Sequence, residues 1–329
     1  MNFLDAKIEP LGLGCWPLSG AMYADGQSVG YTGSDDASAI RAIHAALDHG
    51  ITLFDTAAAY GAGHGERLLG RALQAHPEAV VVTKIGVEID ENAREITGSI
   101  SDPARVVEQI DNCRARLGRD CLDVVLLHLN SEPIATALPM FECMQDARRA
   151  GKIRAFGWST DFSDRAGAIA GMEGALCVEH AMNLFIPASR VQARVRTAGM
   201  IALIRSPLAM GLLSGKYGTH SQLPKGDIRA GDHAWMSYYK NGRPNAELLA
   251  RLDAVRDLLQ TGGRTSVQGA LGWLWAKGGH NLPVPGARNV EQVRGLAGAL
   301  EFGPLPEGVM VEIERLLPPE DHDAPERER

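Results

Sequence analysis

Two kinds of segment alternate along the chain. Short apolar runs rich in β-branched residues, such as residues 79–84 (AVVVTK), have no polar face and are typical of strands buried on both sides of a parallel sheet. Between them lie amphipathic stretches with the 3.6-residue period of a helix. The predicted strands are 11–16, 51–56, 79–84, 121–128, 152–159, 175–180, 200–206 and 281–286. The predicted helices are 36–49, 66–75, 103–117, 135–150, 188–198, 266–277 and 290–300.

Eight strands, nearly each followed by a helix, favour a closed (β/α)8 barrel, the TIM-barrel architecture of the α/β class. We expect residues 1–317 to form this single domain. Outside the repeat lie a long polar, Gly-rich segment at 216–244 after the seventh strand, then a helix near 245–259, and an extra C-terminal helix near 307–317. The final residues, 318–329, are rich in proline and charge, and we expect a disordered tail.

Composition narrows the classes of partner. The chain has 329 residues, 45% of them hydrophobic, and a formal net charge of -7. This charge argues against nucleic acid and anionic membrane as partners. No apolar run reaches the roughly 20 residues of a membrane span, and the first residues lack a signal-peptide pattern, so we expect a cytoplasmic protein. The five cysteines lack metal-ligand spacing and are interpreted as small buried hydrophobes, with no metal site predicted.

The predicted strands end on polar residues. In a (β/α)8 barrel the active site lies at the carboxyl ends of the strands. Strand ends drawn at random would be mostly apolar, so this pattern points to a site at that rim. The end residues are Trp16, Asp55, Lys84, His128, Ser159, His180, Arg205, Ser206 and Gly286.

Four residues at these ends suggest proton transfer to a carbonyl oxygen: Asp55, Lys84, His128 and Tyr60, which follows Asp55 by five residues. A phenol has a pKa near 10 and needs its environment tuned before it serves as an acid. A nearby ammonium lowers that pKa, a carboxylate holds the ammonium in place, and an imidazole orients the carbonyl. Reduction of a carbonyl also needs a hydride, which no side chain supplies, so a nicotinamide cofactor is implied.

The sequence resembles the aldo-keto reductases from about residue 11 to residue 300. The similar segments are GLGCWPLSG, DTAAAYGAGHGERLLGRAL, VVTKIG, DVVLLHLN, GKIRAFGWST, SPLAMGLLSGKY and VPGARNVEQV, in the family's order. The resemblance implies NAD(P)H-dependent reduction of an aldehyde, ketone or sugar carbonyl, or the reverse oxidation. Tyr60 is then the general acid, Lys84 and Asp55 tune it, and His128 orients the substrate.

The resemblance also implies a dinucleotide site without a GxGxxG fingerprint, and NADP(H) is favoured, with NAD(H) as the alternative. Arg288, beside a helix N-terminus, is the candidate for a 2′-phosphate. Thr160 and Glu179 depart from the family's usual asparagine and glutamine. The candidate cofactor residues are Trp16, Asp55, Ser159, Thr160, Glu179, Arg205, Ser206, Pro207, Leu208, Gly211, Gly286, Arg288 and Gln292.

The substrate is expected to be a small carbonyl compound or alcohol held by Trp16, Tyr23, Tyr60, His128 and Trp158, whose rings offer apolar walls. Residues 216–244 are predicted to form a lid. Three alternatives stay open: a Schiff-base enzyme using Lys84, a cofactor-binding sensor module, and an NAD-dependent aldose or alcohol dehydrogenase. The sequence makes no statement about oligomeric state.

Overall fold

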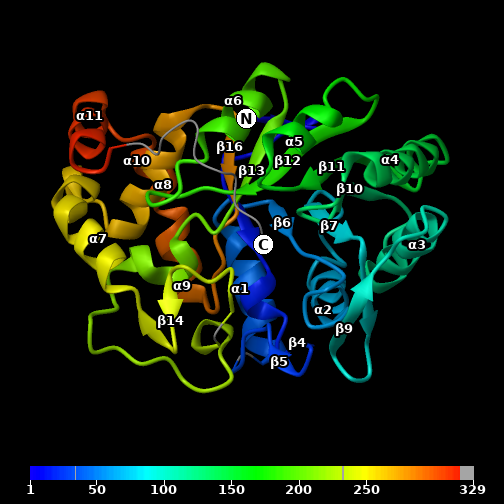
Figure 1. The fold of residues 1–329 in the computed structure, drawn as a ribbon, viewed down its shortest axis with the longest axis horizontal. Coiled ribbons are helices and arrows are strands. Elements are labelled where there is room, and N and C mark those ends of the chain that lie inside the picture. The colour runs from blue at the N-terminus through cyan, green and yellow to red at the C-terminus, as the bar shows by residue number, and fades with distance from the viewer. Residues whose placement is uncertain (34, 232, 319–329) are drawn as a thin grey trace.

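A computed structural model describes residues 1–33, 35–231 and 233–318. Its centre is a sheet of parallel strands in the order β16-β13-β12-β11-β10-β7-β6-β3 (Figure 1). Each strand therefore lies beside its neighbour in the predicted series, and the fold-class prediction is confirmed. The strands are β3 (Gly12–Gly14), β6 (Leu53–Asp55), β7 (Val80–Ile85), β10 (Leu122–Leu127), β11 (Ile153–Ser159), β12 (Ala175–Ala181), β13 (Ile201–Arg205) and β16 (Asn281–Pro283).

The sheet closes where the first strand meets the last. Gly14 forms a parallel bridge to Gly286, and the Gly14 amide donates to the Pro285 carbonyl at 2.9 Å. A Cβ on Gly14 would lie 2.6 Å from the carbonyl oxygen of Val284, so only glycine allows this approach.

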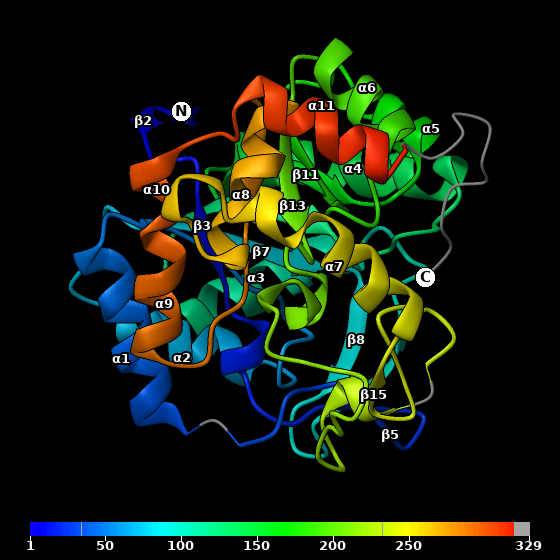
Figure 2. The ribbon, with the colours of Figure 1, turned by 90° about the vertical axis from the view of Figure 1, so that its left-hand side faces the viewer.

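Helices surround the barrel and bury its outer face. Most match the predicted stretches, but the short α5 was missed, because six residues carry too little period to be seen. α7 and α11, both outside the repeat, pack beside α8 (Figure 2). The helices are α1 (Asp36–Asp48), α2 (His64–Ala72), α3 (Arg105–Leu117), α4 (Ile134–Arg149), α5 (Ser163–Ala168), α6 (Ser189–Thr197), α7 (Ala246–Leu259), α8 (Ser266–Lys277), α9 (Val290–Ala297), α10 (Ala299–Phe302) and α11 (Glu307–Leu316), with 3-10 turns at η1 (Trp16–Leu18), η2 (Ala209–Ser214), η3 (Ile228–Ala230) and η4 (Thr261–Gly263).

The interior of the barrel has an apolar lower layer. Alternate strand residues point inward and pack together, and an N-terminal hairpin of β1 (Asn2–Phe3) and β2 (Ala6–Lys7) adds Phe3 and Ile8 to the same cluster. This hairpin was not predicted. The strand residues of the layer are Leu53, Val80, Val82, Val124, Leu126, Ala155, Cys177, Leu203, Leu282 and Val284.

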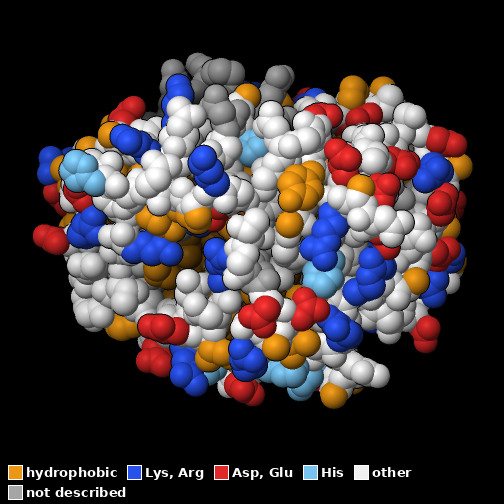
Figure 3. All heavy atoms as spheres, turned by 90° about the horizontal axis from the view of Figure 1, so that it is seen from below, with side chains coloured by type: hydrophobic (Ala, Val, Ile, Leu, Met, Phe, Trp, Pro, Cys, Tyr) orange, Lys and Arg blue, Asp and Glu red, His pale blue; other side chains and the backbone are white. Residues whose placement is uncertain are grey.

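Additional elements gather at the end of the barrel away from the N-terminal hairpin and its apolar layer. This end is at the lower edge of Figure 1. One is a small sheet of β5 (Gln27–Ser28), β4 (Tyr23–Ala24), β9 (Glu95–Ser99) and β8 (Val87–Asp90). The other is the hairpin of β14 (Tyr239–Lys240) and β15 (Arg243–Pro244). Seen from this side, Lys and Arg side chains stand around a hollow with hydrophobic side chains in its wall (Figure 3).

Of the predicted tail, residues 319–329 lie outside the described residues, so the prediction of disorder there stays untested. Within the described ranges no helix is both long and apolar enough to cross a membrane.

Candidate active site

The candidate site is the upper layer of the barrel interior. Asp55 stands two residues after Leu53, Lys84 after Val82, and Glu179 after Cys177, so each continues the inward-facing alternation of the apolar layer below it. His128 and Arg205 hold the same positions relative to Leu126 and Leu203. The period of two therefore brings these polar side chains to one place.

Lys84 is the centre of this layer. Its side chain is completely buried, and its ammonium donates to Asp55, to the Thr56 carbonyl at 2.9 Å and to the Tyr60 hydroxyl at 3.4 Å. These contacts use all three N–H bonds of the ammonium. Glu179 Oε2 also lies 3.2 Å from Nζ as an ion-pair partner. Burial opposes the charge of Lys84, but Asp55 and Glu179 outweigh it and raise its pKa.

Tyr60 is held by the turn that follows β6. Gly61 has a φ of +62°, and a Cβ there would lie 2.1 Å from the Ser19 carbonyl oxygen, so the turn requires glycine at this position. The Tyr60 ring stacks on Trp16, with ring centroids 5.7 Å apart, and meets the edge of His128 at 6.2 Å. Tyr60, Trp16 and His128 are all partly exposed, above the buried Lys84.

Burial and charge fix the protonation of Tyr60. Burial raises its pKa, Lys84 lowers it, and Asp55 and Glu179 raise it again, so the net direction is upward. A phenol with a raised pKa keeps its proton at neutral pH. The structure therefore presents a protonated hydroxyl beside an ammonium, which is the state of a proton donor.

Residues at the end of β11, just after it and on β12 form a second group. The Ser159 hydroxyl donates to Glu179 Oε1 at 3.5 Å. The Thr160 hydroxyl donates to the Asn130 carbonyl at 2.7 Å and accepts the Phe162 amide, so it already supports the neighbouring loop.

Arg205 is the last residue of β13, and only part of its guanidinium is hydrogen-bonded to the described residues. One Nη donates to Asp161, while Nε and Nη1 are buried with no hydrogen-bond partner among the described residues. Buried donors of this kind lack the compensation that buried polar groups normally have. An anionic or amide group of a ligand would supply it, so Arg205 fits a dinucleotide. Sequence reasoning missed Asp161, although an acidic residue two positions after a strand end was visible.

The segment after Arg205 has an unusual backbone. Ser206, Ala209 and Met210 all have positive φ values near +50°, and Gly211 has +93°. Pro207 and Leu208 lie within this curved turn. Such strained backbone gathers at ligand sites. The Ser206 carbonyl accepts from the side-chain amide of Asn183 at 2.9 Å, which ties the turn to the loop after β12.

The adenosine-end candidates lie at the start of α9. Arg288 donates to the Thr32 carbonyl and lies over the Tyr31 ring, 6.0 Å from its centroid. Its amide donates to Gln292 Oε1 at 2.7 Å, so Gln292 shapes the loop that carries Arg288. Gly286 is exposed on the same loop.

Two residues from the strand-end analysis belong to the core instead. Trp158 was predicted to line the substrate pocket, but it points outward from β11, is completely buried, packs on Phe141 of α4 and donates to the Leu129 carbonyl at 2.9 Å. His180 also points outward and is bonded to Gln192 of α6 at 2.9 Å. Both outward orientations follow from the two-residue alternation of a strand, since each residue is next to one that faces inward. Tyr23 is 41% exposed on β4.

Residues 216–244 contain a buried arginine, Arg229. Arg229 is bound by both oxygens of Asp227 and lies over the rings of Tyr31, Tyr217 and Tyr239. The Ile228 amide donates to the Gly30 carbonyl at 3.2 Å, so this part of the segment packs on the loop after Trp16. The segment is thus folded onto the site face, consistent with the position of a lid.

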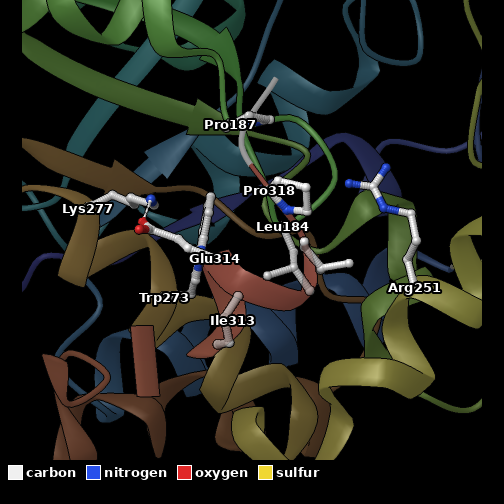
Figure 4. Close-up of a pocket in the computed structure, with 9 residues that line it drawn as sticks. Leu184, Pro187, Arg251, Trp273, Lys277, Ile313, Glu314 and Pro318 are labelled. Atoms are coloured by element: carbon white, nitrogen blue, oxygen red, sulfur yellow. Dashed lines mark hydrogen bonds and ion pairs between the residues drawn. The ribbon is translucent and has the colours of Figure 1, made fainter. Parts of the chain in front are cut away.

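A pocket on the outer helices contains none of the candidate residues. Lys277 and Glu314 form an ion pair at its edge, between α8 and α11 (Figure 4). Its other lining residues are Leu184, Pro187, Arg251, Trp273, Ile313, Leu317 and Pro318. It therefore stands apart from the strand-end site.

Comparison with known proteins decides the family. The model of the aldo/keto reductase family matches residues 10–318. The chain belongs to the aldo/keto reductase family. It is therefore an oxidoreductase, as the sequence predicted.

Individual relatives agree over nearly the whole chain. The aldo-keto reductase YhdN of Bacillus subtilis is 27% identical over 305 residues, 90% of this chain and 87% of its own. An NADP(+) aldo-keto reductase of Schizosaccharomyces pombe, yakc, is 29% identical over 310 residues, 89% and 84% of the two chains. Among solved structures, a glycerol dehydrogenase from Gluconobacter oxydans has a TM-score of 0.79 at 28% identity, covering 98% of this chain and 97% of that one.

Proposed function

We propose that this enzyme transfers hydride between NADP(H) and a small carbonyl compound or alcohol, with Tyr60 as the proton donor to the carbonyl oxygen. The observation that carries the proposal is the partly exposed Tyr60 hydroxyl, 3.4 Å from the buried Lys84 ammonium and beside the His128 ring. Hydride itself comes from the nicotinamide when it is bound.

Each residue of this group has a separate task. The hydroxyl of Tyr60 gives its proton to the substrate oxygen, and Lys84 stabilises the phenolate that remains. Asp55 holds the Lys84 ammonium at the floor of the site. His128 and Trp16 flank Tyr60 and position the carbonyl, and Tyr23 lies on the small sheet at the same face.

The cofactor would lie along the ends of β11, β12, β13 and β16. Ser159 and Glu179 would meet the nicotinamide end, with Trp16, Asp55 and Thr160 beside it. Arg205, with its two unpartnered nitrogens, would meet the ribose or phosphates together with the turn of Ser206, Pro207, Leu208 and Gly211. Gly286, Arg288 and Gln292 would hold the adenosine end.

The relatives' names suggest small substrates. One relative is a pyridoxal reductase of Arabidopsis thaliana, and one structural neighbour is a glycerol dehydrogenase. Both names specify a small polar molecule that has an alcohol or aldehyde group. We therefore expect a substrate of that class. The cytoplasmic location stays a prediction.

The Schiff-base alternative does not suit the geometry. Lys84 is completely buried, and its ammonium already makes three hydrogen bonds. The raised pKa keeps its amine protonated, whereas a Schiff-base lysine must lose its proton. A cofactor-binding sensor module would have the same site residues as an enzyme. Only a measurement of turnover distinguishes the sensor module from the enzyme.

One assay distinguishes these functions. Purified protein is mixed with NADPH and a panel of small aldehydes, ketones and sugars, and the loss of nicotinamide absorbance is followed. Oxidation of alcohols with NADP+ is measured in parallel. Substrate-dependent turnover is expected. Cofactor binding without turnover of any compound would indicate the sensor module, and borohydride trapping of Lys84 on a substrate would indicate the Schiff-base enzyme.

Arg288→Ala tests the choice of cofactor. We expect NADPH binding to weaken by about 10–150-fold, the value of a charge-assisted contact of roughly 1.5–3 kcal/mol, while NADH binding changes little. The measurement is the dissociation constant of each cofactor. Equal losses for both would mean that Arg288 serves structure, through its Thr32 and Tyr31 contacts, or that NAD(H) is the natural cofactor.

A further inference from the structure

Glu179 gives this site a second carboxylate beside its single ammonium. Its side chain is 1% exposed, with Oε2 3.2 Å from Lys84 Nζ and Oε1 3.5 Å from the Ser159 hydroxyl. All three N–H bonds of Lys84 point elsewhere, so Oε2 has no hydrogen-bond donor among the described residues. The charge of Glu179 is therefore met by an ion pair with Lys84 but by no hydrogen bond to Oε2, and a second positive charge nearby would add to its compensation.

The charge count of the cluster reinforces this point. Asp55, Glu179 and Lys84 together carry two negative charges and one positive charge when all are ionised. Burial raises the pKa of Asp55, and Glu179 is the next cause of that rise. The cluster is therefore short of positive charge before any ligand binds.

The neighbouring thiols and the Tyr60 phenol add no negative charge to this cluster near neutral pH. Burial raises the pKa of the Cys15 and Cys177 thiols and of the Tyr60 hydroxyl, so all three stay protonated. Arg205 is paired with Asp161. His128 meets the opposite face of the site, at the Tyr60 ring.

Hydride transfer changes the charge of a nicotinamide ring by one unit, since the oxidised ring is a cation and the reduced ring is neutral. A carboxylate in a buried site favours the cation because attraction there is weakly screened. We propose that Glu179 makes the site discriminate between the two redox forms of the cofactor, because its buried carboxylate favours the cationic, oxidised nicotinamide over the neutral, reduced ring. The inference rests on the proposed hydride-transfer function.

The same carboxylate has a consequence for the reaction. With the nicotinamide bound as proposed above, Glu179 would stabilise the positive charge that grows on the ring as hydride leaves it. Interactions that strengthen in the transition state accelerate the chemical step. Glu179 is therefore expected to act on the chemistry, in addition to cofactor affinity.

The test compares Glu179→Gln with the wild type in cofactor binding without substrate. Dissociation constants for NADP+ and NADPH are measured at neutral pH. In the variant the ratio of the NADP+ constant to the NADPH constant should rise by about 10–150-fold. Glu314→Gln, which alters an ion pair on the outer helices, is the matched control and should leave the ratio unchanged.

An unchanged ratio in Glu179→Gln would overturn the inference. Wild-type protein that binds neither cofactor would instead refute the proposed function on which it rests.

Discussion

The barrel interior has two layers built on the same strands, and they differ in chemistry alone. The lower layer is aliphatic apart from Cys177, and the upper layer holds Asp55, Lys84 and Glu179, each at most 4% exposed. Both layers obey the same inward alternation. Apolar residues in the upper positions would satisfy the fold equally well, because a buried ion cluster generally stabilises a protein no better than apolar packing. The polar residues of the upper layer are therefore explained by the chemistry of the site, and the apolar residues of the lower layer by the stability of the fold.

A second contrast sharpens the first. His128 and His180 both stand at predicted strand ends, yet the first is partly exposed beside Tyr60 and the second is completely buried against α6. The difference is the side of the sheet that each residue faces. Burial lowers the pKa of His180 to about 4, so it stays neutral in the folded protein.

Lys84→Met should have the largest effect, because it leaves two carboxyl groups buried without a cation. We expect a loss of about 3–5 kcal/mol in the free energy of unfolding, together with loss of turnover. Urea unfolding and a carbonyl reduction assay measure the two effects. The control is Lys277→Met, whose surface pair with Glu314 should contribute less than about 1 kcal/mol. Equal destabilisation by both variants would contradict the contrast between the buried and surface pairs.

Leu282→Ala tests the lower layer. Leu282 is completely buried, so the truncation should cost about 2–5 kcal/mol of unfolding free energy. Turnover per folded molecule should stay at the wild-type value, since the residue stands below the polar layer. A selective fall in turnover at full folding would show that the two layers are not separable.

His180→Gln tests the outward-facing histidine through pH. Below pH 6.5 the unfolded chain takes up a proton on His180, and the folded protein does not until about pH 4. Stability therefore falls as the pH drops through this window, by about 3 kcal/mol from this one group. The variant should lack that contribution, as measured by urea unfolding at several pH values. A wild-type-to-variant difference that is constant with pH would refute the neutral, buried assignment.

Much of this molecule could be predicted from the sequence. The strands and their order were predictable because every barrel strand is an apolar run, and the tyrosine, lysine, aspartate and histidine were found at the strand ends. Trp158 was wrongly assigned to the substrate pocket because the assignment used its position near a strand end and ignored which side of the sheet its side chain faces. Its neighbour Ser159 faces inward, and the period of two was available in the sequence.

Other features needed the three-dimensional contacts. The pair of Asp161 and Arg205 joins residues 44 positions apart in the chain. Arg229 belongs to a polar loop, and only the folded structure brings Asp227 and three tyrosines around it. Glu179 Oε2 lacks a hydrogen-bond donor among the described residues because the three N–H bonds of Lys84 point to other acceptors. None of these has a signature in local composition.

The central claim is that Tyr60 donates the proton at the top of this polar layer. Tyr60→Phe removes the hydroxyl and keeps the ring that stacks on Trp16. The decisive measurement is kcat together with the dissociation constant for NADPH. The account predicts a fall in kcat on the order of 10² or more, with NADPH binding nearly unchanged. Retention of more than about a tenth of the wild-type kcat would contradict it.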